Sequence, residues 1–353
     1  MRYLIVDSKE SLQVSQVWGE GKTQFFNTLG ADEILDAIEH VGLKPTGAVN
    51  ALTSMENRVY DIQIEWDDIE QTKNVIAKFY RPGRWSQAQI LEEHQFLKQL
   101  KDAEIAVIPP MKINKKTLFE LSDTGIFYTL FKKQGGRTLD EFDDEQIEQL
   151  GRLLARLHSV GKGEPALHRL KLTPEIFAKN NINFLLKNNI LPSEIRDKYS
   201  DAVDKLCELI TPLFENTYYQ RIHGDCHINN IIWKDNQAML VDFDDFIMGP
   251  PVQDIWLLLP GNDTHSTRQR ALLIDAYNEF YDFDYSSLKL IGPLRALRYV
   301  HFSSWLAIRY ADEAFKRAFP FFANSDYWHL ELQDLYKQIA VIEADANSSG
   351  RKW

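Results

Sequence analysis

The chain has 353 residues, and its 40 Lys and Arg against 51 Asp and Glu give a formal net charge of −11. Hydrophobic residues make up 44% and charged residues 26%, which is typical of a globular protein and excludes a disordered or fibrous one. At roughly 150 residues per domain, this length suits two lobes that share a cleft. The acidic balance argues against a nucleic-acid partner, because neutralising phosphates requires clustered Lys and Arg.

The two cysteines, Cys207 and Cys226, are too few for a disulfide scaffold and indicate a reducing compartment. Uncharged apolar stretches such as 255–260 are far shorter than the ~20 residues that span a bilayer. The first apolar run ends at Asp7, too early for a secretory signal. We therefore expect a cytoplasmic protein with no membrane partner, and a monomer.

The first part of the chain alternates between strand and helix patterns. Residues 1–24 are weakly patterned and are interpreted as an N-terminal extension of unknown role. Residues 25–133 form the predicted N-lobe, an antiparallel sheet with a helix on it. Its expected elements are a helix at 32–41 ended by Gly42 and Pro45, a hairpin of strands at 59–65 and 74–80, a helix at 87–100 and a strand at 125–131.

Gln134-Gly135-Gly136-Arg137 interrupts this pattern and is the predicted hinge at 134–137. Residues 138–353 are the predicted C-lobe, which is mainly helical with one β-type island at 219–243. The expected fold class is therefore α+β, with two lobes. Helical patterns occupy 147–157, 195–215, 266–281, 288–316 and 327–344.

The β-type island contains two apolar runs, 231–233 and 238–241, that predict a hairpin with its turn near Asp235-Asn236. In such a hairpin, residues whose numbers average about 236 lie opposite each other. This pairing places Asn230 beside Asp242 at the open end. An amide oxygen and a carboxylate at one point suit Mg²⁺, which prefers oxygen ligands.

Asp225 lies on the loop that enters this hairpin, five residues before Asn230. A D-x-x-x-x-N spacing followed by Asp242 matches the phosphoryl-transfer arrangement of kinases, in which one Asp accepts the hydroxyl proton. Singly, each of these residues is more often a turn or cap residue. Together they predict Asp225 as the base and Asn230 and Asp242 as ligands of Mg²⁺. The neighbouring side chains are assigned other roles: packing for His223 and Cys226, and solvated or structural roles for Asp244 and Asp245.

Zinc ligation by His223 and His227, in the manner of H-E-x-x-H, is the rival interpretation. That motif requires a helix with Glu in second place, whereas Gly224 stands there after a β-type run.

A nucleotide clamp is predicted from Lys78, which lies in an apolar strand where an unpaired ammonium would be costly. In kinases, a Glu on the next helix fixes the Lys that holds the phosphates of ATP. Glu93 is preferred because it shares the face of Leu97 and Leu100, and Glu92 remains open.

The expected phosphate loop at 51–58 contains no G-x-G-x-x-G, and Ser54 is its candidate phosphate contact. Gly21-Lys22-Thr23 is not a P-loop, because the required Gly is replaced by Gln16.

His223-Gly224-Asp225 with Asn230 and Asp242 resembles the aminoglycoside phosphotransferase and choline kinase superfamily, which has a two-lobed protein-kinase-like fold. The string 150–158 looks like the first long helix of its C-lobe, in which His158 packs. From about Phe25 to the end, the chain further resembles bacterial stress-response protein serine/threonine kinases of this fold. The strings that carry this resemblance are 54–60, 78–85, 90–96, 223–227, 241–245, 249–256, 317–320 and 326–328.

The resemblance implies ATP as co-substrate with Mg²⁺, and protein substrates that include the enzyme itself. It implies these roles: Asp225 as base, Asn230 and Asp242 as Mg²⁺ ligands, Ser54 at the phosphates, Asp254 as an anchor of the catalytic loop, and Phe131 at the hinge that contacts adenine.

A kinase of small-molecule hydroxyls stays open, because fold and motif do not fix the acceptor. A third hypothesis, a non-catalytic nucleotide sensor, is disfavoured because the catalytic residues are all present. The Arg residues within 295–317 disfavour an aminoglycoside acceptor. The candidates for lining the acceptor site are Trp305, Arg309, Tyr327 and Trp328.

Overall fold

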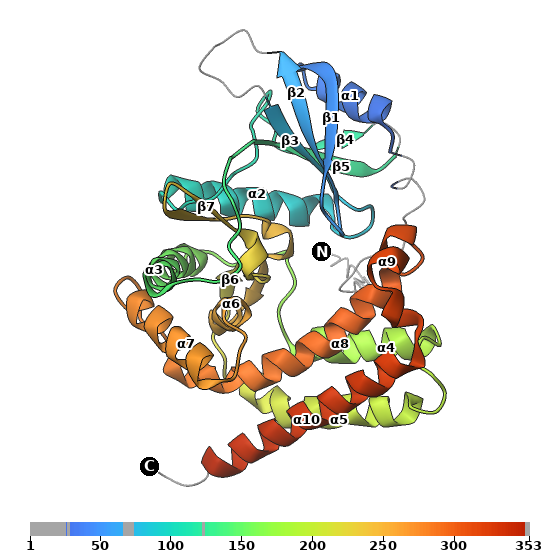
Figure 1. The fold of residues 1–353 in the computed structure, drawn as a ribbon, viewed down its shortest axis with the longest axis vertical. Helices are drawn as coiled ribbons and strands as arrows, with labels where there is room; N and C mark the ends of the chain where they lie inside the picture. The colour runs from blue at the N-terminus through green and yellow to red at the C-terminus, as the bar shows by residue number, and fades with distance from the viewer. Residues whose placement is uncertain (1–25, 27–28, 66–73, 122–123, 350–353) are drawn as a thin grey trace, which may run out of the picture.

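The structure is a computed structural model, and it describes residues 26, 29–65, 74–121 and 124–349. The predicted extension at 1–24 therefore lies outside the described residues. A five-stranded antiparallel sheet in the order β1-β2-β3-β5-β4 forms one end of the molecule (Figure 1). Its strands are β1 Lys44–Leu52, β2 Arg58–Glu65, β3 Asn74–Phe79, β4 Phe119–Leu121 and β5 Ile126–Lys132.

Two helices accompany the sheet. Helix α1 (Ala31–His40) packs Ile34 and Ile38 into a core with the apolar residues of β2, β3 and β5. Helix α2 (Gln87–Asp102) begins at Ser86, whose hydroxyl accepts a hydrogen bond from the Gln89 N–H, as an N-cap should. Phe96 and Leu97 of α2 belong to the core of the helical part. Helix α2 thus joins the sheet to the rest of the molecule.

Strand β1 was not predicted. Pro45 and Gly47 interrupt it, and most of its side chains are exposed, so it shows neither the alternation nor the apolar content of a strand. It lies at the edge of the sheet, where Pro is tolerated, and its register shifts between Pro45 and Val49. Gly47 adopts a φ of +91° inside this bulge.

The remainder is mainly helical, which confirms the predicted α+β class. The expected helix at 288–316 is divided, because α8 ends at Arg309 and the Asp312 carboxylate accepts the Ala314 N–H to begin α9. No helix in the described ranges is long and apolar enough to cross a membrane. The helices are α3 Asp144–Gly161, α4 Asn180–Lys187, α5 Arg196–Glu215, α6 Val252–Leu258, α7 Thr264–Tyr277, α8 Ile291–Arg309, α9 Glu313–Ala318 and α10 Ser325–Ser349.

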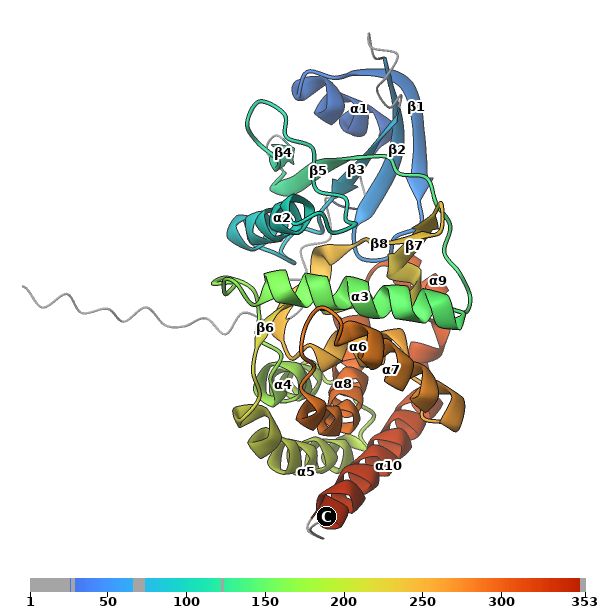
Figure 2. The same cartoon turned by 90° about the vertical axis from the view of Figure 1, so that its left-hand side faces the viewer.

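The β-type island forms two small antiparallel pairs, β6 (Gln220–Ile222) with β9 (Ile247–Gly249) and β7 (Ile231–Lys234) with β8 (Gln237–Leu240). Figure 2 shows the β7–β8 hairpin between the large sheet and α3. Its turn residues, Asp235 and Asn236, both have positive φ, as a two-residue hairpin turn requires.

The register of this hairpin corrects one prediction. Ile231 pairs with Leu240, so Asn230 lies opposite Val241 rather than Asp242, and the Val241 N–H donates to the Asn230 carbonyl at 3.0 Å. Strand β5 ends at Lys132 and α3 begins at Asp144. The division of the chain into lobes at 134–137 stays a prediction.

Candidate active site

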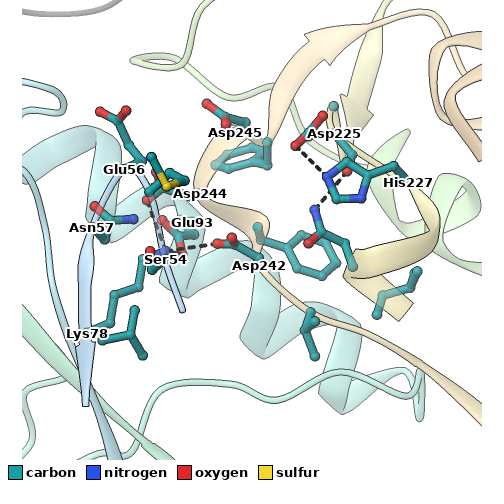
Figure 3. Close-up of a pocket in the computed structure, with 18 of the residues that line it drawn as sticks. Ser54, Glu56, Asn57, Lys78, Glu93, Asp225, His227, Asp242, Asp244 and Asp245 are labelled. Carbon is teal, nitrogen blue, oxygen red and sulfur yellow. Dashed lines mark hydrogen bonds and ion pairs between the residues drawn. The ribbon is translucent and has the colours of Figure 1, made fainter. Parts of the chain in front are cut away.

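A cavity of about 810 Å³ lies where the large sheet meets the helical part. The loop between β1 and β2, strand β3, the β7–β8 hairpin with its flanking loops, and helix α8 contribute to its lining. Figure 3 shows carboxylates from both sides converging on it. All of the site residues predicted from the sequence line this cavity: Ser54, Lys78, Glu93, Asp225, Asn230 and Asp242.

Lys78 is the buried cation of the site. Its Nζ lies 3.0 Å from Oδ1 of Asp244, 3.2 Å from Oδ1 of Asp242 and 3.8 Å from Oε1 of Glu93. Burial alone would lower the pKa of Lys78, but these carboxylates raise it well above its usual value. The side chain is therefore an ammonium ion that can attract phosphates.

Of the two roles expected for Asp244, solvated or structural, its contacts fit the structural one. Its carboxylate is buried, contacts Lys78 and accepts a hydrogen bond from Trp85 Nε1 at 3.3 Å. The short 3₁₀ turn at Phe243–Asp245, entered through the positive φ of Asp242, turns this side chain inward. Asp244 is therefore buried beside Lys78 and is not solvated.

Glu93 and Glu92 point in different directions. Glu93 lies between Lys78 and Arg169, with its Oε2 3.0 Å from Arg169 Nη2. Glu92 accepts the backbone N–H groups of the loop at 167–169. The structure thus places Glu93, not Glu92, beside Lys78. Sequence patterns gave no signal for Arg169, which comes from a loop of the helical part.

The loop that carries Asp225 is held by Asp254. The buried Asp254 carboxylate accepts the N–H groups of His223 at 2.8 Å and Gly224 at 2.9 Å. It also contacts Nε2 of the buried His158 at 3.0 Å. Gly224 has a φ of +84°, and a Cβ there would lie 2.3 Å from the Asp245 carbonyl oxygen, so only glycine fits.

The Asp225 carboxylate has a side-chain partner on each oxygen. Its Oδ1 lies 3.2 Å from Nη1 of Arg298, and its Oδ2 lies 3.3 Å from Nε2 of His227. Burial would raise the pKa of Asp225, but the hydrogen bond to His227 and the charge of Arg298 hold it below its usual range. The same contact raises the pKa of His227. Asp225 is therefore an ionised acceptor of hydrogen bonds.

Asn230 and Asp242 have the donor atoms that Mg²⁺ requires. Asn230 Nδ2 donates to the Asp225 carbonyl at 2.9 Å, which leaves its Oδ1 without a protein donor among the described residues. The Asp242 side chain is 55% exposed and lines the cavity. An amide oxygen and an exposed carboxylate fit a cation that is completed by water and phosphates.

Zinc is not supported by the geometry. The His223 ring is buried against Phe243 and its Nε2 contacts the Val241 carbonyl at 2.9 Å, whereas His227 contacts Asp225. Within the described ranges, no group of three His, Cys, Asp or Glu could hold a metal ion.

The loop between β1 and β2 carries Ser54 and a partly buried carboxylate, Glu56, that the sequence did not reveal. Glu56 contacts Arg309 at 2.6 Å and accepts a hydrogen bond from Trp305 Nε1 at 2.8 Å, both from α8. Burial would raise the pKa of Glu56, but Arg309 and Arg84 lower it.

These contacts change the predicted acceptor lining. Of the four candidates, Trp305 lines the cavity. Arg309 is instead buried beneath the loop against Glu56. Tyr327 and Trp328 pack against each other and against Phe322, away from the cavity.

Comparison with known proteins identifies the family. Residues 51–291 match the sequence model of the phosphotransferase enzyme family. The chain belongs to this family. Stress response kinase A of Escherichia coli is 36% identical over 319 residues, which cover 90% of this chain and 95% of that protein. The serine/threonine protein kinase RdoA of Salmonella typhimurium is 35% identical over 320 residues, covering 90% and 94%.

Among solved structures, amicoumacin kinase in complex with AMP-PNP and Ca²⁺ has a TM-score of 0.68 at 18% identity, covering 89% of this chain and 96% of that one. This likeness establishes a shared fold. The phosphotransferase is an ATP-dependent kinase, and the family resemblance inferred from the catalytic-loop motif is confirmed.

Proposed function

We propose that this phosphotransferase transfers the γ-phosphate of ATP to Ser or Thr hydroxyls of proteins, including its own. The observation that carries the proposal is the convergence of Asp225, Asn230, Asp242 and Lys78 on one cavity. The chain also aligns over 90% of its length with a relative named as a serine/threonine protein kinase. The name of the first relative also supports a role in bacterial stress response. The use of ATP and two free, buried cysteines support a cytoplasmic location.

In this proposal each side chain has a distinct task. Asp225 orients the acceptor hydroxyl and accepts its proton. Asn230 and Asp242 would hold Mg²⁺, which neutralises phosphate charge when it is bound. Lys78 contacts the phosphates and is kept in place by Glu93. Positioning and electrostatic stabilisation supply most of the catalysis in phosphoryl transfer.

The nucleotide is proposed to lie against the large sheet. Ser54 lines the cavity from the loop after β1 and is proposed to contact the phosphates. Phe131 on β5 lines it as well, and we propose that adenine binds next to it.

A kinase of small-molecule hydroxyls is the second candidate. The cavity volume of about 810 Å³ favours this function, because it lies within the range of pockets that enclose small ligands. The two functions use the same catalytic residues and differ in the acceptor.

The test supplies both kinds of acceptor. The protein and an Asp225→Asn variant are incubated with Mg²⁺, γ-labelled ATP, a dephosphorylated protein fraction and the metabolite pool of the same cells. We expect label on Ser and Thr of proteins, and none with the variant. Label that enters only a metabolite would identify a small-molecule kinase.

A further inference from the structure

Both oxygens of the proposed base are engaged before any acceptor binds. Arg298 Nη1 lies 3.2 Å from Oδ1 of Asp225, and His227 Nε2 lies 3.3 Å from Oδ2. A general base must offer one oxygen to the acceptor hydroxyl at hydrogen-bond distance. Each carboxylate oxygen has two lone pairs, so the acceptor hydroxyl can approach Asp225 either beside these partners or by displacing one of them.

Arg298 is the partner that can leave. His227 belongs to the same short loop as Asp225, whereas Arg298 reaches it from α8 and its side chain is 43% exposed. Among the described residues, Asp225 is the one polar group that Arg298 contacts. A long, half-exposed guanidinium with a single partner can move to a neighbouring anion at little cost in packing.

Other carboxylates on this side of the cavity already have arginine partners. Asp245 contacts Arg84, and Glu56 contacts Arg309. Beyond Arg298, helix α8 lines the cavity with Phe302 and Trp305 and with His301, whose pKa burial lowers well below its usual value, so α8 adds no carboxylate to this wall. A cationic acceptor would therefore meet Arg298 without a free carboxylate beside it.

We propose that Arg298 is a specificity-determining residue, which binds an acidic side chain adjacent to the acceptor Ser or Thr. On binding, the acceptor hydroxyl takes the place of the guanidinium at Oδ1 of Asp225, and the guanidinium pairs with the acidic side chain of the substrate. An acceptor that carries the matching charge therefore frees Oδ1 of the base and is held beside it. This inference rests on the proposed protein kinase activity.

The test compares three peptides, each with one Ser, that differ only in having Glu, Gln or Lys next to it. Wild-type enzyme should phosphorylate the Glu peptide with a kcat/KM about tenfold above that of the Gln peptide, the effect of one partly desolvated ion pair. Arg298→Met should bring this ratio close to one, Arg298→Lys should retain part of it, and Arg298→Glu should favour the Lys peptide.

Arg295→Met is the matched control. Arg295 lies one turn earlier on α8, and its Nη2 donates to the Pro260 carbonyl at 2.6 Å and to Asn262 Oδ1 at 2.9 Å, outside the cavity. This variant should keep the wild-type ratio. An equal loss for all three peptides in Arg298→Met, or a wild-type enzyme indifferent to the flanking charge, would overturn the inference while leaving protein kinase activity intact. Absence of phosphate on every peptide would overturn both.

Discussion

Oε1 of Glu56 lies 2.6 Å from Nη2 of Arg309, so a carboxylate of the β1–β2 loop is paired with a guanidinium of helix α8. Arg309 is 1% exposed, and Arg81 and Arg84 also lie within ion-pair distance of Glu56. The contact joins the loop that carries Ser54 to the helix that carries Arg298. The proposed nucleotide and acceptor sides of the cavity are therefore linked by a largely buried charge pair.

Replacing Glu56 with Gln should destabilise the protein and weaken ATP binding. The substitution leaves buried arginines without their shared anion, a change that costs about 3 kcal/mol or more. Chemical denaturation should show this loss, and the KM for ATP should rise. Asp144→Asn, which removes an exposed carboxylate paired with Arg268, is the control and should leave both quantities unchanged. Equal stability of Glu56→Gln and wild type would contradict a structural role for the pair.

Glu93→Gln and Glu92→Gln form a matched pair of neighbours. Glu93 contacts Lys78 and Arg169, whereas Glu92 contacts the backbone at 167–169. Loss of the Glu93 charge should lower kcat/KM for ATP by roughly tenfold to a hundredfold, because Lys78 loses the partner that orients it. Glu92→Gln should change it by much less. Steady-state kinetics at varied ATP would show the reverse order if Glu92 were the partner in the active enzyme.

Asp254→Asn should slow phosphoryl transfer with little effect on ATP binding. Asp254 holds the catalytic loop through the N–H groups of His223 and Gly224, and it does not line the cavity. An amide accepts both N–H groups less well and brings its own donors into a buried site. We expect kcat to fall by roughly tenfold to a hundredfold while calorimetry shows ATP affinity close to wild type. A lower affinity with unchanged kcat would place Asp254 in nucleotide binding.

Glu331 should make the free energy of unfolding depend on pH, independently of catalysis. Burial and the neighbouring charge of Asp334 raise the pKa of this carboxyl from 4.5 to about 7, although the hydrogen bonds from Ser303 and Tyr199 act in the opposite direction. The folded state favours the neutral form, so the free energy of unfolding contributed by Glu331 falls as pH rises from about 4.5 through about 7.

Relative to Glu331→Gln, the wild type should therefore lose on the order of 2 kcal/mol between roughly pH 5 and pH 8. Denaturant titrations of both proteins across this range measure the difference. Parallel pH profiles would show that the Glu331 carboxyl has an ordinary pKa.

Much of the site was predictable because its residues lie in short, patterned segments. Asp225, Asn230 and Asp242 fall within one stretch around a hairpin, and the two apolar runs of that hairpin identified it. Lys78 was recognisable because an ammonium in an apolar strand needs anions, and the structure supplies three.

The contacts between distant segments were not predictable. Glu56 and Arg309 are 253 positions apart in the sequence, and Asp225 and Arg298 are 73 positions apart. No local sequence pattern signals such pairs. Strand β1 was missed because an exposed edge strand containing Pro and Gly lacks the usual pattern. The Asn230 register was wrong by one position, because the strands pair about the midpoint of Asp235 and Asn236 and not about Asn236.

Asp225→Asn tests most directly whether Asp225 is the base for phosphoryl transfer from ATP to a hydroxyl. The asparagine keeps the shape of the side chain but cannot accept the proton. Calorimetry with Mg²⁺ and ATP should show binding close to wild type, while the single-turnover rate of phosphoryl transfer falls on the order of 10²- to 10⁴-fold. A transfer rate within a few-fold of wild type would contradict the assignment.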